Sequence, residues 1–142
     1  MTTIHRSALV ARPARRLFEL VNDVAGYPAR FRWCEASEVM EESDTHMLAR
    51  LDLKVAGLRT SFTTRNALVR DERIELALVE GPFRKLSGHW AFQALAEDAC
   101  KVSLHLDFET AGKLVGTALA SGFAGLADRL VDDFCSEARR GA

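Results

Sequence analysis

The sequence predicts an α+β fold in which a curved antiparallel β-sheet wraps around one long C-terminal α-helix. Apolar residues recur with a period of two from Glu35 to Thr110, as in strands that have one wet face. After Gly112 the period becomes 3.6, which is typical of an amphipathic helix. One or two short helices are expected after the first strand. The apolar face of the sheet and the apolar stripe of the helix must pack against each other.

The chain has the size and composition of one folded domain, which we expect to span residues 1–142. Its 48% hydrophobic content is too high for a disordered chain. Three cysteines, an odd number without metal-ligand spacing, argue against a disulfide framework and favour a reducing compartment. The N-terminus lacks the apolar stretch of a signal peptide, so we expect a cytoplasmic protein.

The N-terminal third should hold a strand and short helices. We expect the first strand at residues 4–10 and a helix from about Pro13 to Asn22. Proline suits the first turn of a helix because its missing N–H would have no partner there. Gly26 and Pro28 then punctuate residues 24–33, which predicts a short helix or turn. Three aromatic residues should anchor this segment: Tyr27, Phe31 and Trp33.

The middle of the chain alternates between apolar and polar residues. This pattern predicts consecutive antiparallel strands at residues 47–55, 58–68, 74–78, 85–95 and 101–110. The expected turns lie at Gly57, Asp71-Glu72, Gly81-Pro82 and residues 96–99. One set of alternate residues in each strand is apolar, so a continuous dry surface should face the helix.

The C-terminal helix should run from about Lys113 to Arg139, roughly 40 Å at ~1.5 Å per residue, and can cross the whole sheet. Its first half holds Gly116, Gly122 and Gly125, each of which costs up to ~1 kcal/mol relative to alanine. Two explanations stay open. The glycines allow the helix to pack closely on the sheet, or they leave room for a ligand beneath it.

Several short stretches occur in an order that covers the chain from Ile4 to about Ala138. They are Asn22-Asp23-Val24, Tyr27-Pro28, Trp33-Cys34, Phe62-Thr63-Thr64-Arg65-Asn66, Gly81-Pro82-Phe83, Gly88-His89-Trp90-Ala91-Phe92, and Cys100-Lys101-Val102 leading to Leu106-Asp107-Phe108. No single stretch is specific. The ordered set resembles the coenzyme Q-binding, START-like family, whose bacterial members are also named ribosome-association toxins (RatA).

The sequence departs from the family pattern in two places. The family usually reads Tyr-Pro-x-Phe-x-Pro-Trp-Cys after the first helix, whereas residues 27–34 shift the phenylalanine to Phe31 and lack the second proline. This difference concerns the mouth of the expected cavity. Near the C-terminus, Glu137 and Arg139-Arg140 stand where the family has an arginine and often a tyrosine.

The resemblance implies a helix-grip (START-like) fold with a hydrophobic cavity. It also implies non-enzymatic binding of ubiquinone (coenzyme Q) or a related isoprenoid lipid, which would support respiratory electron transport. Ubiquinone would then be a bound ligand and not a catalytic cofactor. The alternative function is that of a toxin that binds a ribosomal subunit and inhibits translation initiation. A second alternative is an aromatase/cyclase-type enzyme, because the polyketide cyclase/dehydrase superfamily shares the fold.

A ligand cavity should be mostly apolar and should offer a few hydrogen-bonding groups. Thr64 and Asn66 lie in the inward row of a predicted strand and could supply these groups, although Asn66 could equally close the strand end. The complete set of candidate ligand-binding residues is Phe62, Thr64, Asn66, Leu76, Leu78, Phe83, Trp90, Phe92, Leu104, Leu106, Phe108, Leu119, Phe123 and Leu126. Most of these residues would otherwise simply fill the core.

The sequence offers no convincing catalytic or metal site. The histidines are far apart along the chain, whereas a zinc site needs three or four clustered ligands. His105 and Asp107 share the wet face of a strand, which favours a surface contact over an acid–base pair. Cys34 lies in an apolar turn beside Trp33 and should be a buried thiol. No Gly-x-Ser-x-Gly elbow occurs.

Charge is unevenly distributed, although the net charge is only −1. Residues 1–33 carry an excess of arginine, and residues 34–52 an excess of acid. The basic segment could bind lipid headgroups or RNA phosphates, or the two segments could simply be solvated faces. We expect a hydrophobic small molecule as the main partner. Peripheral contact with the inner membrane and a ribosomal subunit are further candidates, and DNA is not expected.

Overall fold

The structure is a computed structural model that describes residues 2–55, 57–111 and 114–140. In these residues, seven antiparallel strands form one sheet in the order β1-β7-β6-β5-β4-β3-β2. The strands are β1 (Thr2–Val10), β2 (Cys34–Glu42), β3 (His46–Val55), β4 (Leu58–Val69), β5 (Arg73–Glu80), β6 (Phe83–Ala96) and β7 (Ala99–Thr110). The helices are α1 (Ala14–Asn22), the 3₁₀ turn η1 (Val24–Gly26), α2 (Tyr27–Arg30) and α3 (Leu114–Arg140).

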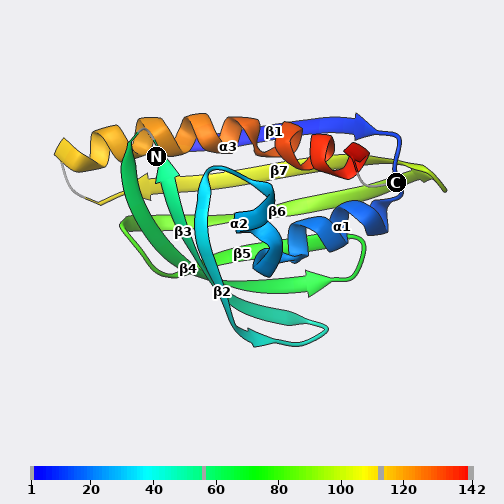
Figure 1. Cartoon of the computed structure of the whole chain (residues 1–142), viewed down its shortest axis with the longest axis horizontal. Helices are drawn as coiled ribbons and strands as arrows, with labels where there is room; N and C mark the ends of the chain where they lie inside the picture. Colours follow the sequence, from blue (N-terminus) through cyan, green and yellow to red (C-terminus); the bar gives the residue numbers. More distant parts are fainter. Residues whose placement is uncertain (1, 56, 112–113, 141–142) are drawn as a thin grey trace.

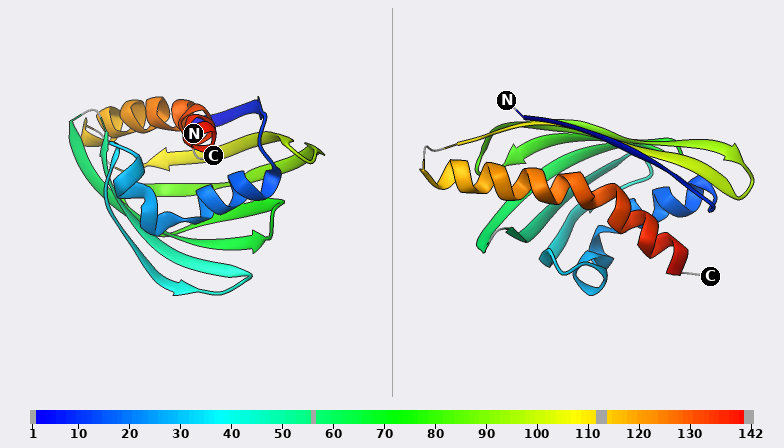
Figure 2. Two further views of the ribbon diagram at one scale, coloured as in Figure 1. Left: turned by 45° about the vertical axis from the view of Figure 1, so that its right-hand side comes forward. Right: turned by 90° about the horizontal axis from the view of Figure 1, so that it is seen from above.

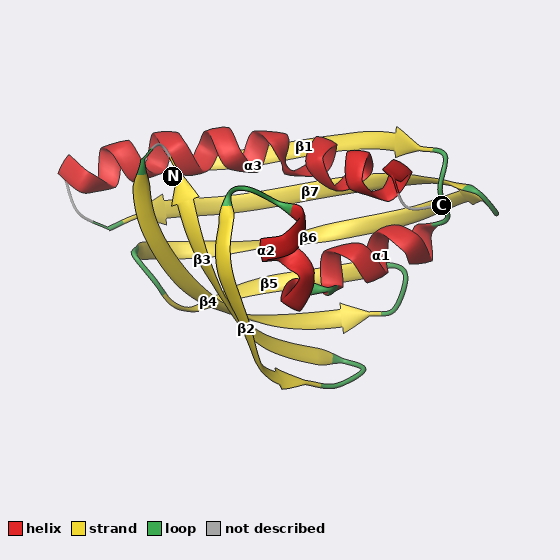
Figure 3. Cartoon of the chain, in the orientation of Figure 1, coloured by secondary structure: helices red, strands yellow, loops and turns green. Residues whose placement is uncertain are grey.

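The sheet curves, and the helices lie against its concave side. Figure 1 shows α3 running alongside β1 and β7, with α1 and α2 in front of the middle strands. Figure 2 shows the strands sweeping around α3 from two further directions. In Figure 3 all helical segments lie on the same side of the sheet. The predicted helix-grip fold, with short helices after the first strand, is confirmed.

Most predicted boundaries agree with the structure to within a few residues. Pro13 is the N-cap of α1, so the helix begins one residue later than expected. The predicted start of α3 at Lys113 lies outside the described residues, as does the side-chain environment around Gly116.

The sequence pattern did not single out β2. This strand lies at the edge of the sheet, and its pairing with β3 has register shifts at Cys34/Ala36 and Val39/Glu41. Each shift reverses which residues face inward, so a strict period of two is lost.

Two turns have the backbone geometry that their residues suggested. Gly57 has a φ of +77° and Asp71 a φ of 64°, both in the left-handed region. At Gly81, between β5 and β6, φ is 154° and an added Cβ would lie 2.6 Å from Cβ of Phe62. Glycine at this corner therefore lets the chain pass directly over Phe62.

The core lies between the inner face of the sheet and α3. Inward residues of β7 (Val102, Leu104, Leu106 and Phe108) are at most 4% exposed. From α3, the stripe of Leu119, Phe123, Leu126, Val131 and Phe134 is buried against them. Gly125 lies outside this stripe, and an added Cβ there would meet nothing within 4 Å. Close packing on the sheet therefore does not explain Gly125.

Candidate functional site

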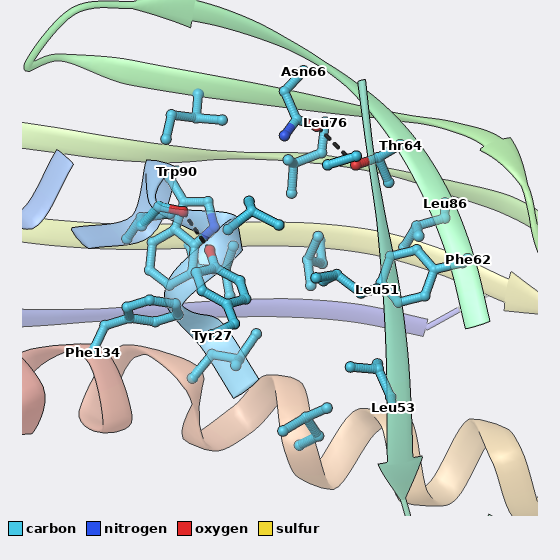
Figure 4. A pocket seen from close by; sticks show the side chains of 18 of the residues that line it. Tyr27, Leu51, Leu53, Phe62, Thr64, Asn66, Leu76, Leu86, Trp90 and Phe134 are labelled. Carbon is cyan, nitrogen blue, oxygen red and sulfur yellow. Dashed lines mark hydrogen bonds between the residues drawn. The ribbon is translucent and has the colours of Figure 1, made fainter. Parts of the chain in front are cut away.

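A cavity of about 90 Å³ lies between the sheet and the helices (Figure 4). Inward residues of β3 to β7 form one wall, the segment from the end of α1 to α2 closes one end, and α3 covers the side opposite the sheet. The lining residues are Val21, Asn22, Val24, Tyr27, Trp33, Ala49, Leu51, Leu53, Phe62, Thr64, Asn66, Ile74, Leu76, Leu86, Trp90, Leu104, Leu106, Phe123, Leu126, Leu130 and Phe134. Apolar side chains dominate this wall, as in most sites for small hydrophobic ligands.

Two polar side chains of β4 interrupt the apolar wall. Thr64 and Asn66 are 9% and 6% exposed and lie two residues apart, so both face inward. The hydroxyl of Thr64 donates to Oδ1 of Asn66 over 2.8 Å. Figure 4 shows the amide nitrogen of Asn66 directed toward the space between the side chains. Because its oxygen is already engaged, the amide presents its N–H groups to the cavity.

Two more side chains with polar groups, Asn22 and Trp90, lie in the wall. Oδ1 of Asn22, at the end of α1, is buried and accepts no hydrogen bond from any described residue. Trp90 also lines the cavity, is 4% exposed and carries an indole N–H donor. Buried polar groups of native proteins are usually paired, so the oxygen of Asn22 is a candidate partner for a ligand.

Aromatic side chains close one end of the cavity. Tyr27, Phe31 and Trp33 pack around Phe134 of α3, with ring centroids 4.7 to 6.5 Å from it. The hydroxyl of Tyr27 donates to the carbonyl oxygen of Val21. Burial raises the pKa of Tyr27, so the phenol stays protonated. The anchors predicted from the sequence thus hold the N-terminal segment against α3.

Trp33 separates the cavity from the surface. Its indole N–H donates to Oδ2 of Asp133 on α3 over 3.2 Å, and its ring stacks on Phe31 at a centroid distance of 4.9 Å. The same residue lines a surface depression of about 280 Å³, together with Arg30, Phe31, Arg32, Asp133, Ser136, Glu137 and Arg140. Trp33 is therefore a wall common to the two spaces.

The structure brings together nine of the fourteen candidate ligand-binding residues around this cavity: Phe62, Thr64, Asn66, Leu76, Trp90, Leu104, Leu106, Phe123 and Leu126. The other five do not line it: Leu78, Phe83, Phe92, Phe108 and Leu119. Phe83 and Phe108 contact each other and the lining residue Phe123, so they form a layer of aromatic rings next to the cavity. Phe92 packs edge-on against Phe18 of α1 instead.

The sequence reasoning missed other lining residues, chiefly in two groups. Val21, Asn22, Val24, Tyr27 and Trp33 come from the helical N-terminal segment, and no periodicity indicates which end of the sheet they cover. Ala49, Leu51 and Leu53 come from β3, where their shared inward phase was visible in the sequence. Ile74, Leu86, Leu130 and Phe134 complete the set.

All four histidines lie on one row across the sheet, although they are far apart in sequence. Strand by strand, the row runs through His5, His105, His89, Glu75, Ala67 and His46. The ring of His105 lies 5.6 Å from those of His5 and His89, measured between centroids. In the described part of the chain, no group of histidine, cysteine and acidic side chains is placed to hold a metal ion.

His105 and Asp107 form a contact on the outer face of the sheet, as the sequence suggested. Nε2 of His105 lies 3.0 Å from Oδ2 of Asp107, and the Thr3 hydroxyl donates to Oδ1 over 2.7 Å. The Thr3 hydroxyl and the His105 ring lower the pKa of Asp107. Cys34 is buried, and desolvation raises the pKa of its thiol to about 11, so it is a poor nucleophile at neutral pH.

Both charged segments are only partly paired. Acids of the 34–52 segment pair with arginines in Glu35–Arg59, Glu41–Arg65 and Asp52–Arg50. In the basic segment Arg6 pairs with Asp128 and Arg30 with Asp23, whereas Arg15, Arg16 and Arg32 form no ion pair with any described residue. Within the described residues, no helix has the length and apolarity needed to cross a bilayer.

Comparisons with known proteins agree with this architecture. Residues 10–135 match the family described as polyketide cyclase / dehydrase and lipid transport. The ribosome association toxin RatA of Pseudomonas aeruginosa is 49% identical over 98% of this chain and 96% of its own. The mitochondrial coenzyme Q-binding protein coq10 of Schizosaccharomyces pombe is 30% identical over 87% of this chain and 78% of its own.

The structure of the Zhui aromatase/cyclase from Streptomyces sp. R1128 superimposes with a TM-score of 0.84 and 25% identity, covering 98% of this chain and 94% of that one. The relatives are thus named for toxin or binding roles, whereas this structural neighbour is named for an enzyme. The family match covers most of the chain, and the toxin relative aligns along nearly its whole length. The chain belongs to the polyketide cyclase / dehydrase and lipid transport family.

Proposed function

We propose that the protein is a non-enzymatic binding protein for a hydrophobic ligand with a polar ring, of which ubiquinone is the type. The observation that carries this proposal is the buried apolar cavity in which Thr64 orients the amide of Asn66. A quinone carbonyl would accept from the free N–H of that amide, and the apolar wall would surround the ring. The relative named for coenzyme Q binding supports the same ligand class.

The chemistry of the cavity wall favours binding over catalysis. General acid–base catalysis needs a group whose pKa lies near the working pH. Among the described lining residues, Tyr27 is the one ionisable side chain, and its raised pKa and hydrogen bond to Val21 leave it inert near neutral pH. The described wall therefore offers no pair of ionisable side chains for acid–base catalysis.

The size of the cavity limits what it can enclose. A volume of about 90 Å³ is below the ~150 Å³ that holds benzene in an engineered protein cavity. Ligand binding therefore requires the wall to move, and an isoprenoid tail would extend outside. We expect the ligand to be exchanged at a membrane surface, where the tail stays in an apolar environment.

A cavity-filling variant tests this proposal. Ala49 is 3% exposed and lines the cavity, so Ala49→Met should fill it. Ala67 lies on the exposed face of β4, so Ala67→Met is the matched control. Titration with a short-chain benzoquinone should quench Trp33 and Trp90 fluorescence saturably in the parent and in Ala67→Met, but not in Ala49→Met.

Two results would overturn the proposal. One is the absence of saturable quenching in the parent together with native mass spectra free of any co-purified lipid. The other is unchanged quinone binding in a folded Ala49→Met variant, because the ligand would then lie elsewhere. Thermal unfolding of both variants separates loss of binding from loss of structure.

A second candidate function is binding to a ribosomal subunit. The relative named as a ribosome association toxin supports it, as do Arg15, Arg16 and Arg32, which form no ion pair with any described residue. Neutralising the three to glutamine should abolish co-sedimentation with ribosomal subunits at low salt. The control neutralises three ion-paired arginines, Arg50, Arg59 and Arg65. No co-sedimentation of the parent at low salt would exclude this candidate.

A further inference from the structure

The cavity wall offers a hydrogen-bond acceptor that a quinone cannot satisfy. Asn22 lines the cavity. Its Oδ1 is buried and accepts no hydrogen bond from any described residue. Quinone carbonyl oxygens are acceptors only. A bound quinone could pair with the N–H groups of Asn66 and Trp90, but it would leave the oxygen of Asn22 unpaired.

A ligand hydroxyl would satisfy both kinds of group. It donates its proton to one partner and accepts from another through its lone pairs. A hydroquinone carries such a hydroxyl in place of each quinone carbonyl while it keeps the flat, apolar ring. A buried acceptor without a donor is destabilising, and a ligand that pairs it recovers that free energy on binding.

We propose that the cavity selects a ring that bears a hydroxyl group, so that it binds the hydroquinone form in preference to the quinone. This inference rests on the proposed function and assigns the selection to Asn22. The hydroxyl donates to Oδ1 of Asn22, while Asn66 serves both redox forms as a donor. We expect the hydroquinone to bind about tenfold or more tightly than the quinone. A tenfold preference raises the midpoint potential of the bound couple by about 30 mV.

Three ligands that share the same ring and the same short tail test the proposal on the unaltered protein. They are a short-chain benzoquinone, its hydroquinone under anaerobic conditions, and the dimethyl ether of that hydroquinone. The ether keeps the acceptor oxygens and has no proton to donate, so it should bind like the quinone. Tryptophan fluorescence gives the three affinities, and redox titration of the bound couple gives the potential independently.

Two variants assign the preference to a residue. Asn22→Leu keeps the approximate side-chain volume and removes the acceptor, so the ratio of hydroquinone to quinone affinity should fall to about one. Asn66→Leu removes a donor used by both forms, so both affinities should fall and their ratio should persist. The unaltered protein keeps the test decisive if either variant fails to fold.

The outcomes separate this inference from the proposed function. Equal affinity for all three ligands would overturn the selection for a hydroxyl and leave quinone binding intact. Tighter binding of hydroquinone that survives in a folded Asn22→Leu variant would overturn the assignment to Asn22. If none of the three ligands binds, the proposed function fails for this ligand class and the inference fails with it.

Discussion

The hydroxyl of Thr64 holds the amide of Asn66 in one orientation, through a 2.8 Å hydrogen bond inside an otherwise apolar cavity. Removing the hydroxyl would leave a buried amide oxygen without a donor, and the amide would be free to rotate. The Thr64 hydroxyl thus determines that a ligand meets the N–H end of the Asn66 amide and not its oxygen.

Thr64→Val should therefore lower both stability and ligand affinity. We expect a loss of about 1–3 kcal/mol in the free energy of unfolding, because Oδ1 of Asn66 is left unpaired. Thr64→Ser keeps the hydroxyl and should retain most of the quinone affinity. Thr60 is half-buried on the same strand and does not line the cavity, so Thr60→Val is the control. Chemical denaturation and fluorescence titration measure the two effects, and equal behaviour of the Thr64→Val and Thr60→Val variants would contradict the role of Thr64.

The histidine row predicts that stability falls in mild acid. Burial, Arg73 and His105 lower the pKa of His89, so the folded state disfavours its protonation more than the unfolded state does. The folded state therefore has its full free energy of unfolding above pH ~6.5, the pKa of an unfolded histidine. It loses part of that free energy as the pH falls through this value toward the lowered pKa of folded His89. Asp107 acts in the same direction, but only near and below ~4, the range in which an unperturbed carboxyl titrates.

Melting temperatures at pH 7.5 and 5.5 check this prediction. The parent should melt at a lower temperature at pH 5.5, and His89→Gln should reduce the difference. His46 lies on the same row but has no ring contact with the other histidines, so His46→Gln should leave the difference unchanged. A parent that is equally stable at both pH values would show that the row does not couple to folding.

Gly125 supplies a prediction about helix α3 and ligand entry. Its added Cβ would meet open space, so Gly125→Ala should stabilise the helix by about 0.5–1 kcal/mol. If the glycine keeps α3 pliable for ligand uptake, the quinone association rate should fall in the same variant. A higher melting temperature with an unchanged association rate would remove this helix segment from the entry route. Gly81→Ala is the opposite case, because its Cβ would collide with Phe62.

The sequence predicted the fold well where periodicity reports burial directly. The inward row of β7 follows strict alternation, and that of β4 does so except at Thr63, which is also buried beside a register shift. Asp71, with a φ of 64°, marks the turn after β4. Edge strand β2 was not predicted from the sequence, because its register shifts break the alternation. The residues at the end of the cavity were not predicted, because the position of Tyr27 against Phe134 depends on how the chain folds back, which periodicity does not encode. The row of four histidines was missed for the same reason, since the antiparallel register brings His5 opposite His105.

A matched pair of leucines separates cavity lining from core packing. Leu126 and Leu17 are 1% and 0% exposed, and only Leu126 lines the cavity. Either leucine changed to alanine should lose about 2–5 kcal/mol of unfolding free energy, because each leaves a space in the core. Leu126→Ala adds that space to the ligand cavity, so it should bind quinones with bulkier ring substituents more tightly than the parent does. Leu17→Ala should keep the parent's order of preference among the same ligands. If both variants changed the preference equally, the ligand would not occupy the space beneath α3, and the shared effect would reflect general loosening of the core.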